Sequence, residues 1–160
     1  TRRSSDLNLN DVIFASPDAG GAERVREYAK YFETDFVICD KNRVKANEVK
    51  SVQVIGNVEG KDVIIIDDLI DTGGTISMAS KVIMEKGAKS VRALISHPVL
   101  SGNAEKNLED SVLEELVVTD SIPLKFRNKK IKVLSIAGLI AKAIRKIHEN
   151  ESTSSLFINR

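Results

Sequence analysis

The sequence predicts an α/β fold with a mostly parallel, twisted sheet flanked by helices on both faces. Two observations support this prediction. Short apolar runs rich in β-branched residues alternate along the chain with segments whose apolar residues recur at helical spacing, an order that favours right-handed βαβ crossovers. The chain has 160 residues, 42% of them hydrophobic, which is enough for one domain with its own core.

The first half of the chain predicts four strands and one helix. The apolar run at residues 12–15 is the first strand, and apolar residues at i, i+3, i+4 and i+7 predict a helix over residues 21–32. Further apolar runs predict strands at residues 35–39, 52–55 and 62–67. Residues 40–50 are polar and basic, so we expect a mobile loop there.

The second half continues the alternation. A helix is predicted over residues 74–86 and is stopped by Gly87, and a strand follows at residues 90–96. A loop opens at Ser101 and leads into a short helix, and strands are predicted at residues 116–119 and 131–134. A strong apolar stripe predicts a last helix over residues 135–150, with Lys142, Arg145 and Lys146 on its solvated face.

Charge and composition exclude several classes of function. The net charge of +1, the scarcity of aromatic residues and the absence of Trp weigh against nucleic-acid binding. The single cysteine, Cys39, has no internal disulfide partner. Because the sequence shows neither a secretory nor a membrane-spanning segment, we expect a cytoplasmic protein with no membrane partner.

The segment from Val63 to Thr75 is the most informative part of the chain. A buried strand ends in the paired acids Asp67 and Asp68, and a short turn follows, made of Asp71, Thr72, Gly73, Gly74 and Thr75. Because this turn opens a helix, its N–H groups and the helix dipole favour a phosphate, and the acids suit ribose hydroxyls or Mg²⁺. A plain capped turn would need one polar side chain only. The segment is neither a Walker A motif nor GxGxxG.

Two other polar segments follow predicted strands. Asp18, Gly20 and Gly21 follow the first strand, so that Asp18 is a candidate Mg²⁺ ligand and the glycines a candidate diphosphate site. From these residues alone, an ordinary turn centred on Asp18 is an equal alternative. Lys41 and Arg43 follow the second strand, where a solvated charge run is the alternative to a role in the site.

In combination, these segments resemble the ribose-phosphate pyrophosphokinase (phosphoribosyl pyrophosphate synthetase) family. The resemblance runs from Asn10 almost to the end of the chain. It is carried by Asp18-Ala19-Gly20-Gly21-x-x-Arg24, Lys41-x-Arg43, residues 45–49, the loop from Asp67 to Thr75, and residues 96–102, 118–123 and 151–157. Asn42 and Pro98 depart from the usual pattern of the family, at positions to which we assign no chemistry.

The resemblance implies a type I phosphoribosyltransferase-like fold and the transfer of a diphosphoryl group from Mg-ATP to ribose 5-phosphate. It assigns the 5-phosphate to Asp71–Thr75, the ribose hydroxyls to Asp67 and Asp68, and the reacting phosphates to Lys41 and Arg43 as catalytic residues. It places Mg²⁺ at Asp18, Asp67 and Asp68, with Gly20 and Gly21 beside the diphosphate. The tail after residue 150 resembles a regulatory region, with Ser152, Ser154 and Ser155 as candidates, although a frayed polar terminus is an equal alternative.

The resemblance covers the carboxyl half of that two-domain enzyme. We therefore expect residues 1–160 to form one domain that lacks an amino-terminal partner domain, and an intact enzyme that is a homo-oligomer. The isolated chain should be inactive or nearly so, because nothing in it completes the ATP site. Two alternatives remain: a phosphoribosyltransferase that uses phosphoribosyl pyrophosphate, and a non-catalytic regulatory relative of the synthetase.

Overall fold

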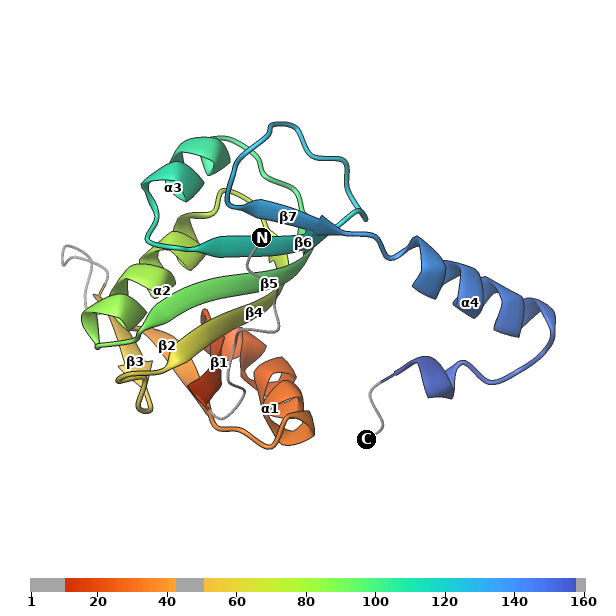
Figure 1. Cartoon of the computed structure of the whole chain (residues 1–160), viewed down its shortest axis with the longest axis horizontal. Helices are drawn as coiled ribbons and strands as arrows, with labels where there is room; N and C mark the ends of the chain where they lie inside the picture. The colour runs from red at the N-terminus through yellow and green to blue at the C-terminus, as the bar shows by residue number, and fades with distance from the viewer. Residues whose placement is uncertain (1–10, 43–50, 158–160) are drawn as a thin grey trace.

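A seven-stranded sheet forms the centre of the molecule (Figure 1). The computed structural model describes residues 11–42 and 51–157, and the strand order is β3-β2-β1-β4-β5-β6-β7. Only β2 and β3 pair antiparallel, and every other neighbouring pair is parallel. The strands are β1 (Val12–Ser16), β2 (Phe36–Asn42), β3 (Ser51–Ile55), β4 (Asp62–Ile70), β5 (Ser90–Pro98), β6 (Glu115–Thr119) and β7 (Ile131–Leu134).

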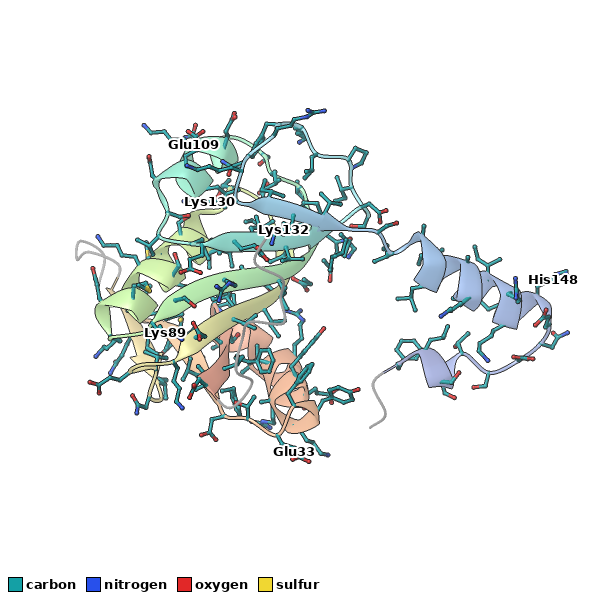
Figure 2. All side chains as sticks on the ribbon, in the orientation of Figure 1. Glu33, Lys89, Glu109, Lys130, Lys132 and His148 are labelled. Carbon is teal, nitrogen blue, oxygen red and sulfur yellow. The ribbon has the colours of Figure 1, made fainter. Side chains whose placement is uncertain are left out.

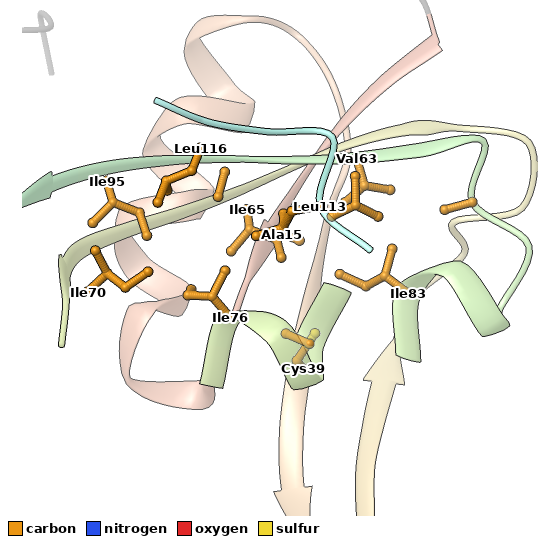
Figure 3. Close-up of a cluster of buried hydrophobic side chains, with 14 of the residues drawn as sticks. Ala15, Cys39, Val63, Ile65, Ile70, Ile76, Ile83, Ile95, Leu113 and Leu116 are labelled. Atoms are coloured by element: carbon orange, nitrogen blue, oxygen red, sulfur yellow. The ribbon is translucent and has the colours of Figure 1, made fainter. Parts of the chain in front are cut away.

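Helices cover both faces of the sheet, as the sequence predicts. The covering helices are α1 (Ala22–Tyr31), α2 (Gly74–Glu85) and α3 (Ala104–Asp110). The described chain also contains α4 (Ala137–His148) and the short 3₁₀ turns η3 (Ala19–Gly21) and η4 (Ser154–Leu156). Because side chains alternate along a strand, Ile13 and Ala15 of β1 join the large core beneath α2 and α3, part of which Figure 3 shows. Phe14 points to the other face and packs with Val25 and Ala29 of α1.

Strands β2 and β4 extend furthest beyond their predicted ends. Strand β2 continues through Lys41 and Asn42 because β3 pairs with it antiparallel, and Lys41 lies opposite Val52. The expectation of a loop from residue 40 is therefore wrong for residues 40–42. Strand β4 continues past its acid pair to the buried Ile70, which pairs with Pro98 of β5. Pairing to a neighbour maintains each strand where its own apolar pattern has ended.

Helix α4 projects away from the body of the domain (Figure 1), and none of its residues is buried in the described structure. Its apolar stripe therefore finds no core within the described chain, although the pattern predicts an amphipathic helix correctly. Figure 2 shows His148 at the far end of this projection. Together with β7 and the tail, the helix exposes an apolar strip, which consists of Val133, Leu134, Leu139, Ile140, Ile144, Ile147 and Phe157.

A buried carboxylate anchors the amino ends of β4 and β5. Asp62 accepts hydrogen bonds from Ser90 Oγ at 2.5 Å and from Lys89 Nζ at 3.1 Å. Arg92 Nη1 lies 3.9 Å from Asp62, and its Nη2 pairs with Glu114 at 2.6 Å. Burial raises the pKa of Asp62, but the hydrogen bonds from Ser90 and Lys89 and the charges of Lys89 and Arg92 outweigh it, so the net pKa is lowered.

None of the described helices is both long enough and apolar enough to cross a lipid bilayer.

Candidate ribose-phosphate site

The candidate site lies at the carboxyl ends of β1 and β4. These strands are direct neighbours in the sheet, with Ala15 opposite Ile65. The Asp18 loop follows β1, while Asp67 and Asp68 lie near the end of β4, just before the Asp71–Thr75 loop. The carboxyl ends of parallel strands are where α/β sheets bind ligands. The fold thus brings the two predicted loops together from distant parts of the sequence.

The Asp71–Thr75 loop opens helix α2. Gly73 adopts a left-handed conformation at φ +75°, which a residue with a side chain rarely tolerates, and it is the N-cap of α2. Because the N-cap residue is a glycine, it offers no side chain to the first N–H groups of the helix. The alternative, a turn capped by Asp or Thr, would place one of these residues at the N-cap, whereas the N-cap here is Gly73. A helix start with a glycine at its N-cap is suited to an anion.

Residues that follow β5 hold the loop in place. Ser101 Oγ donates to the Asp71 carboxylate, and Asn107 Nδ2 donates to the Thr72 carbonyl at 2.7 Å. In α2, Ser77 Oγ donates to the Asn107 carbonyl at 3.0 Å. The loop is thus fixed from outside its own segment. Ser101 lies in a motif that carries the family resemblance, whereas no local signal points to Asn107.

The Asp18 loop is folded on itself. Asp18 Oδ1 accepts hydrogen bonds from the N–H groups of Gly20 at 3.0 Å and Gly21 at 3.2 Å. A side chain at Gly21 would place its Cβ 2.6 Å from Ser16 Oγ, so this glycine is required for close packing. Both N–H groups that we expect beside a diphosphate already have the Asp18 acceptor. Their predicted role remains a prediction.

Arg24, near the start of α1, contacts the acid pair on β4, and the sequence reasoning missed this contact. Its Nη1 lies 2.8 Å from Asp67 Oδ1, and its Nη2 lies 2.6 Å from Asp68 Oδ2. Burial raises the pKa of Asp67, and the Asp68 charge adds to the rise, while the Asp68 N–H and Arg24 act in the opposite direction. The available signal was an Arg in the first turns of the helix that follows a candidate loop.

The neighbouring strand ends are also linked. His97 Nδ1 lies 2.9 Å from Ser121 Oγ, and the Ser96 carbonyl accepts from Thr119 Oγ1 at 2.6 Å. Ser121 Oγ also lies 3.1 Å from the Ser96 carbonyl. These contacts fix the carboxyl end of β5 to the end of β6 and the residues just after it, beside the acid pair on β4.

The remaining predicted residues are placed less fully. Lys41 lies in the last part of β2, where the structure defines its backbone, and Arg43 lies outside the described residues. Ser152 and Ser154 are exposed, and Ser152 Oγ donates a hydrogen bond to Ser154 Oγ at 2.9 Å. Ser155 lies in the same segment beyond α4. The structure therefore does not bring these serines to the acid pair. Their predicted regulatory role is untested.

The chemistry of the donors fits a shared magnesium ion. Asp18, Asp67 and Asp68 offer carboxylate oxygens, the ligands that Mg²⁺ prefers. Within the described residues, no group of three or more His, Cys, Asp or Glu side chains is placed to hold a metal. Mg²⁺ usually binds through one or two carboxylates and completes its shell with water and substrate phosphates. These residues therefore suit an ion that binds together with a phosphorylated substrate.

Known proteins resemble this chain along nearly its whole length. The family model for the phosphoribosyl synthetase-associated domain matches residues 15–158. A ribose-phosphate pyrophosphokinase from Helicobacter hepaticus is 54% identical over 150 residues, which make up 94% of this chain and 48% of the relative. The chain thus spans about half the length of the curated relatives it matches.

Solved structures agree with the predicted fold. The crystal structure of phosphoribosylpyrophosphate synthetase from Mycobacterium smegmatis has a TM-score of 0.82 at 35% identity, and the match covers 91% of this chain and 48% of that one. An adenine phosphoribosyl transferase from Trypanosoma brucei has a TM-score of 0.52 at 16% identity, over 88% of this chain and 71% of its own. The second likeness concerns the fold alone. The phosphoribosyltransferase-like α/β fold is confirmed.

Proposed function

This chain belongs to the phosphoribosyl synthetase-associated domain family, and on that basis we propose that it is the carboxyl-terminal half of a ribose-phosphate pyrophosphokinase. The whole protein would transfer the diphosphoryl group of Mg-ATP to the anomeric hydroxyl of ribose 5-phosphate. The hydroxyl oxygen bonds to the β-phosphorus and gives up its proton. The bond from that phosphorus to the oxygen bridging the α-phosphate breaks, and AMP leaves with the electron pair. The other product is phosphoribosyl pyrophosphate.

One observation carries the proposal. The paired acids Asp67 and Asp68 lie near the carboxyl end of an inner strand, shortly before a glycine-bearing loop that starts a helix at Gly73, and the Asp18 loop follows the neighbouring strand. A phosphate at the loop would leave the attached sugar within reach of carboxylates, which accept hydrogen bonds from hydroxyls. A simple phosphate site would need no acid pair.

Each group then has a role that its chemistry supports. Asp71–Thr75 and the start of α2 hold the 5-phosphate, and Asp67 and Asp68 accept hydrogen bonds from the ribose hydroxyls. The Asp18 loop lies beside the diphosphoryl group. Lys41 and Arg43 supply positive charge to the reacting phosphates as negative charge develops. Magnesium, when bound, would neutralise charge on the phosphates.

The partners are proposed on the same basis. ATP binding is proposed to require a second domain, because the chain spans about half the length of its curated relatives. The apolar strip on β7, α4 and the tail supports such a domain as its cover, since exposed contiguous apolar surface marks an interface. Hydrogen exchange tests this: α4 amides should exchange fast in the isolated chain and slowly in the full-length gene product. Fast exchange in both would contradict the proposed cover.

Location and assembly belong to the proposal as well. We place the protein in the cytoplasm, which agrees with its single buried cysteine, Cys39. A homo-oligomer is proposed for the intact enzyme. The alternatives, a phosphoribosyltransferase or a regulatory relative, are separated from the synthetase by one assay on the full-length protein. Only the synthetase releases AMP from Mg-ATP in a manner that depends on ribose 5-phosphate.

The site itself is tested by titrating ribose 5-phosphate into the chain by calorimetry with Mg²⁺ present. Gly74→Val should abolish binding, because the side chain blocks the approach of phosphate to the backbone. The nearest atom to a Cβ at Gly74 is Thr72 Oγ1 at 3.8 Å, so the fold itself tolerates the first added carbon. Gly138→Val is the matched control: Gly138 lies near the start of α4, and among the described residues a Cβ there would meet no atom within 4 Å apart from its chain neighbours and its own helix backbone. Equal binding by Gly74→Val and the unaltered chain would contradict the assignment.

A further inference from the structure

Asn107 of α3 contacts the candidate phosphate loop and helix α2 at the same time. Its Nδ2 donates to the Thr72 carbonyl at 2.7 Å, and its own carbonyl accepts from Ser77 Oγ at 3.0 Å. A Cβ at Gly73 would lie 3.7 Å from the Asn107 Cβ, so the loop also packs against this residue. Asn107 is therefore placed to act on the Thr72–Gly73 peptide, which lies directly before the first turn of α2.

Helix α3 gives Asn107 a fixed base. Ala104 and Leu108, which lie on either side of Asn107 in the sequence, are completely buried in the core. At the carboxyl end of the helix, Lys130 Nζ donates to the Leu108 carbonyl at 2.8 Å and to the Ser111 carbonyl at 2.6 Å. A side chain on an anchored helix can hold its partner in one orientation.

The two carbonyls that precede Thr72 in the chain accept from backbone groups. The Leu100 N–H donates to the Ile70 carbonyl at 3.2 Å, and the Ser101 N–H donates to the Asp71 carbonyl at 3.1 Å. At the Thr72 carbonyl, a side chain supplies a donor. This peptide is therefore a point of the loop whose orientation a side-chain substitution can change.

The orientation of the Thr72–Gly73 peptide decides whether the loop offers a donor or an acceptor there. In a trans peptide, as every described peptide of this chain is, the C=O and the N–H point in opposite directions. Because the Thr72 carbonyl points to Asn107, the Gly73 N–H points away from it. Gly73 has φ +75°, but glycine populates positive and negative φ about equally, so the glycine alone does not fix this orientation.

We propose that Asn107 is a positioning residue that sets the Thr72–Gly73 peptide so that the Gly73 N–H faces the 5-phosphate. This inference rests on the proposed ribose-phosphate function. When the Asn107 donor is lost, the peptide can turn about the bonds on its two sides, since a glycine at position 73 tolerates the new φ. The loop then presents the Thr72 carbonyl, which has no proton to donate and repels an anion.

The test compares the unaltered chain with Asn107→Leu and Asn107→Ala. Leu has the same branched outline as Asn but cannot donate, whereas Ala removes the contact as well. In calorimetry with Mg²⁺ present, the affinity for ribose 5-phosphate should fall roughly tenfold in both variants, the scale of one hydrogen bond to a charged group. If one variant does not fold, the other decides.

The NMR signals of the backbone amides separate peptide orientation from general loosening. Saturating ribose 5-phosphate should move the Gly73 amide proton downfield in the unaltered chain, because a hydrogen bond to an anion deshields the proton. In the Asn107 variants at saturation, this shift should be lost, while the amide signals in the later turns of α2 keep their positions. A purely structural role for Asn107 would instead displace signals along α2 and α3 before any ligand is added.

Asn103→Ala is the matched control, because Asn103 is exposed at the start of α3 and its side chain makes no capping hydrogen bond. It should bind ribose 5-phosphate as the unaltered chain does, and thermal unfolding checks that each variant is folded. Unchanged affinity in a folded Asn107 variant, a full Gly73 shift there at saturation, displaced signals along α2 and α3, or an equal loss in Asn103→Ala would overturn the inference alone. Failure of the unaltered chain to bind ribose 5-phosphate would instead overturn the proposed function and the inference with it.

Discussion

Replacing Asp62 by Asn should destabilise the fold without touching the site. Asp62 lies at the amino end of β4, the end opposite to the paired acids, and is 5% exposed. Asn can still accept from Ser90 Oγ but loses its negative charge. It therefore weakens the contacts to Lys89 and Arg92 and turns a charge-assisted hydrogen bond into a neutral one.

The expected size follows from these contacts. A hydrogen bond to a charged group contributes about 1.5–3 kcal/mol, and a neutral one about 0.5–1.5 kcal/mol. The Lys89 side chain is 65% exposed, so its ion pair with Asp62 should contribute only the ~0–1 kcal/mol that is typical of surface pairs. We expect the free energy of unfolding to fall by about 1–2 kcal/mol at neutral pH.

The pH dependence identifies the charge as the cause. The pKa of Asp62 is lowered in the folded state from its ordinary value of 3.8, so the carboxylate stabilises the fold above that value. This contribution is lost as pH falls through the folded-state pKa, because both forms are then neutral at position 62. The difference between the variant and the unaltered chain should shrink in that range.

Urea unfolding followed by circular dichroism at about pH 7 and about pH 3 measures both quantities. Asp35→Asn, at an exposed carboxylate, is the control and should change stability little. A penalty of equal size at both pH values would show that packing, not charge, is responsible. No penalty at neutral pH would refute the reasoning entirely.

Three further changes test other contacts. Gly21→Ala should lower the free energy of unfolding by about 1–3 kcal/mol, because its Cβ would lie 2.6 Å from Ser16 Oγ, whereas Gly138→Ala in open space should not. Lys130→Met should cost a similar ~1–3 kcal/mol in urea unfolding, since Nζ donates to three carbonyls at the carboxyl end of α3 and just after it, and burial lowers its pKa. Unchanged stability would mean that water satisfies those carbonyls. In the full-length protein, Lys41→Ala and Arg43→Ala should each lower kcat on the order of 10²-fold, with a smaller change in KM for ribose 5-phosphate. Turnover within a few-fold of the unaltered enzyme would show that these residues form a solvated charge run with no catalytic role.

Local patterns in the sequence predicted the parts of the site that are local. The strand, acid pair, glycine loop and helix from Val63 to Thr75 follow one another in the chain, so apolar runs and turn residues were enough to find them. The same holds for Asp18, whose loop directly follows a buried strand. Helix α2 begins where the glycine pair predicts.

Contacts between distant segments were not accessible in this way. The pairing of Arg24 with Asp67 and Asp68 spans more than forty residues, and an amphipathic pattern does not tell which strand an arginine will reach. The extension of β2 through Lys41 depends on pairing with β3, which begins only at Ser51 in the sequence. The stripe of α4 predicted a helix with an apolar face, but the pattern alone cannot identify what covers that face.

The pairing of β1 with β4 has a consequence for how the chain folds. Ile13 lies opposite Val63, with α1, β2 and β3 between them in the sequence. Closing so long a segment costs entropy before any contact repays it, and non-local parallel pairing forms slowly compared with a helix. Neither α1 nor α2 can assemble the acid pair and its arginine by itself. After dilution from denaturant, ribose 5-phosphate binding should therefore return with the slowest change in circular dichroism and not with the early gain of helix.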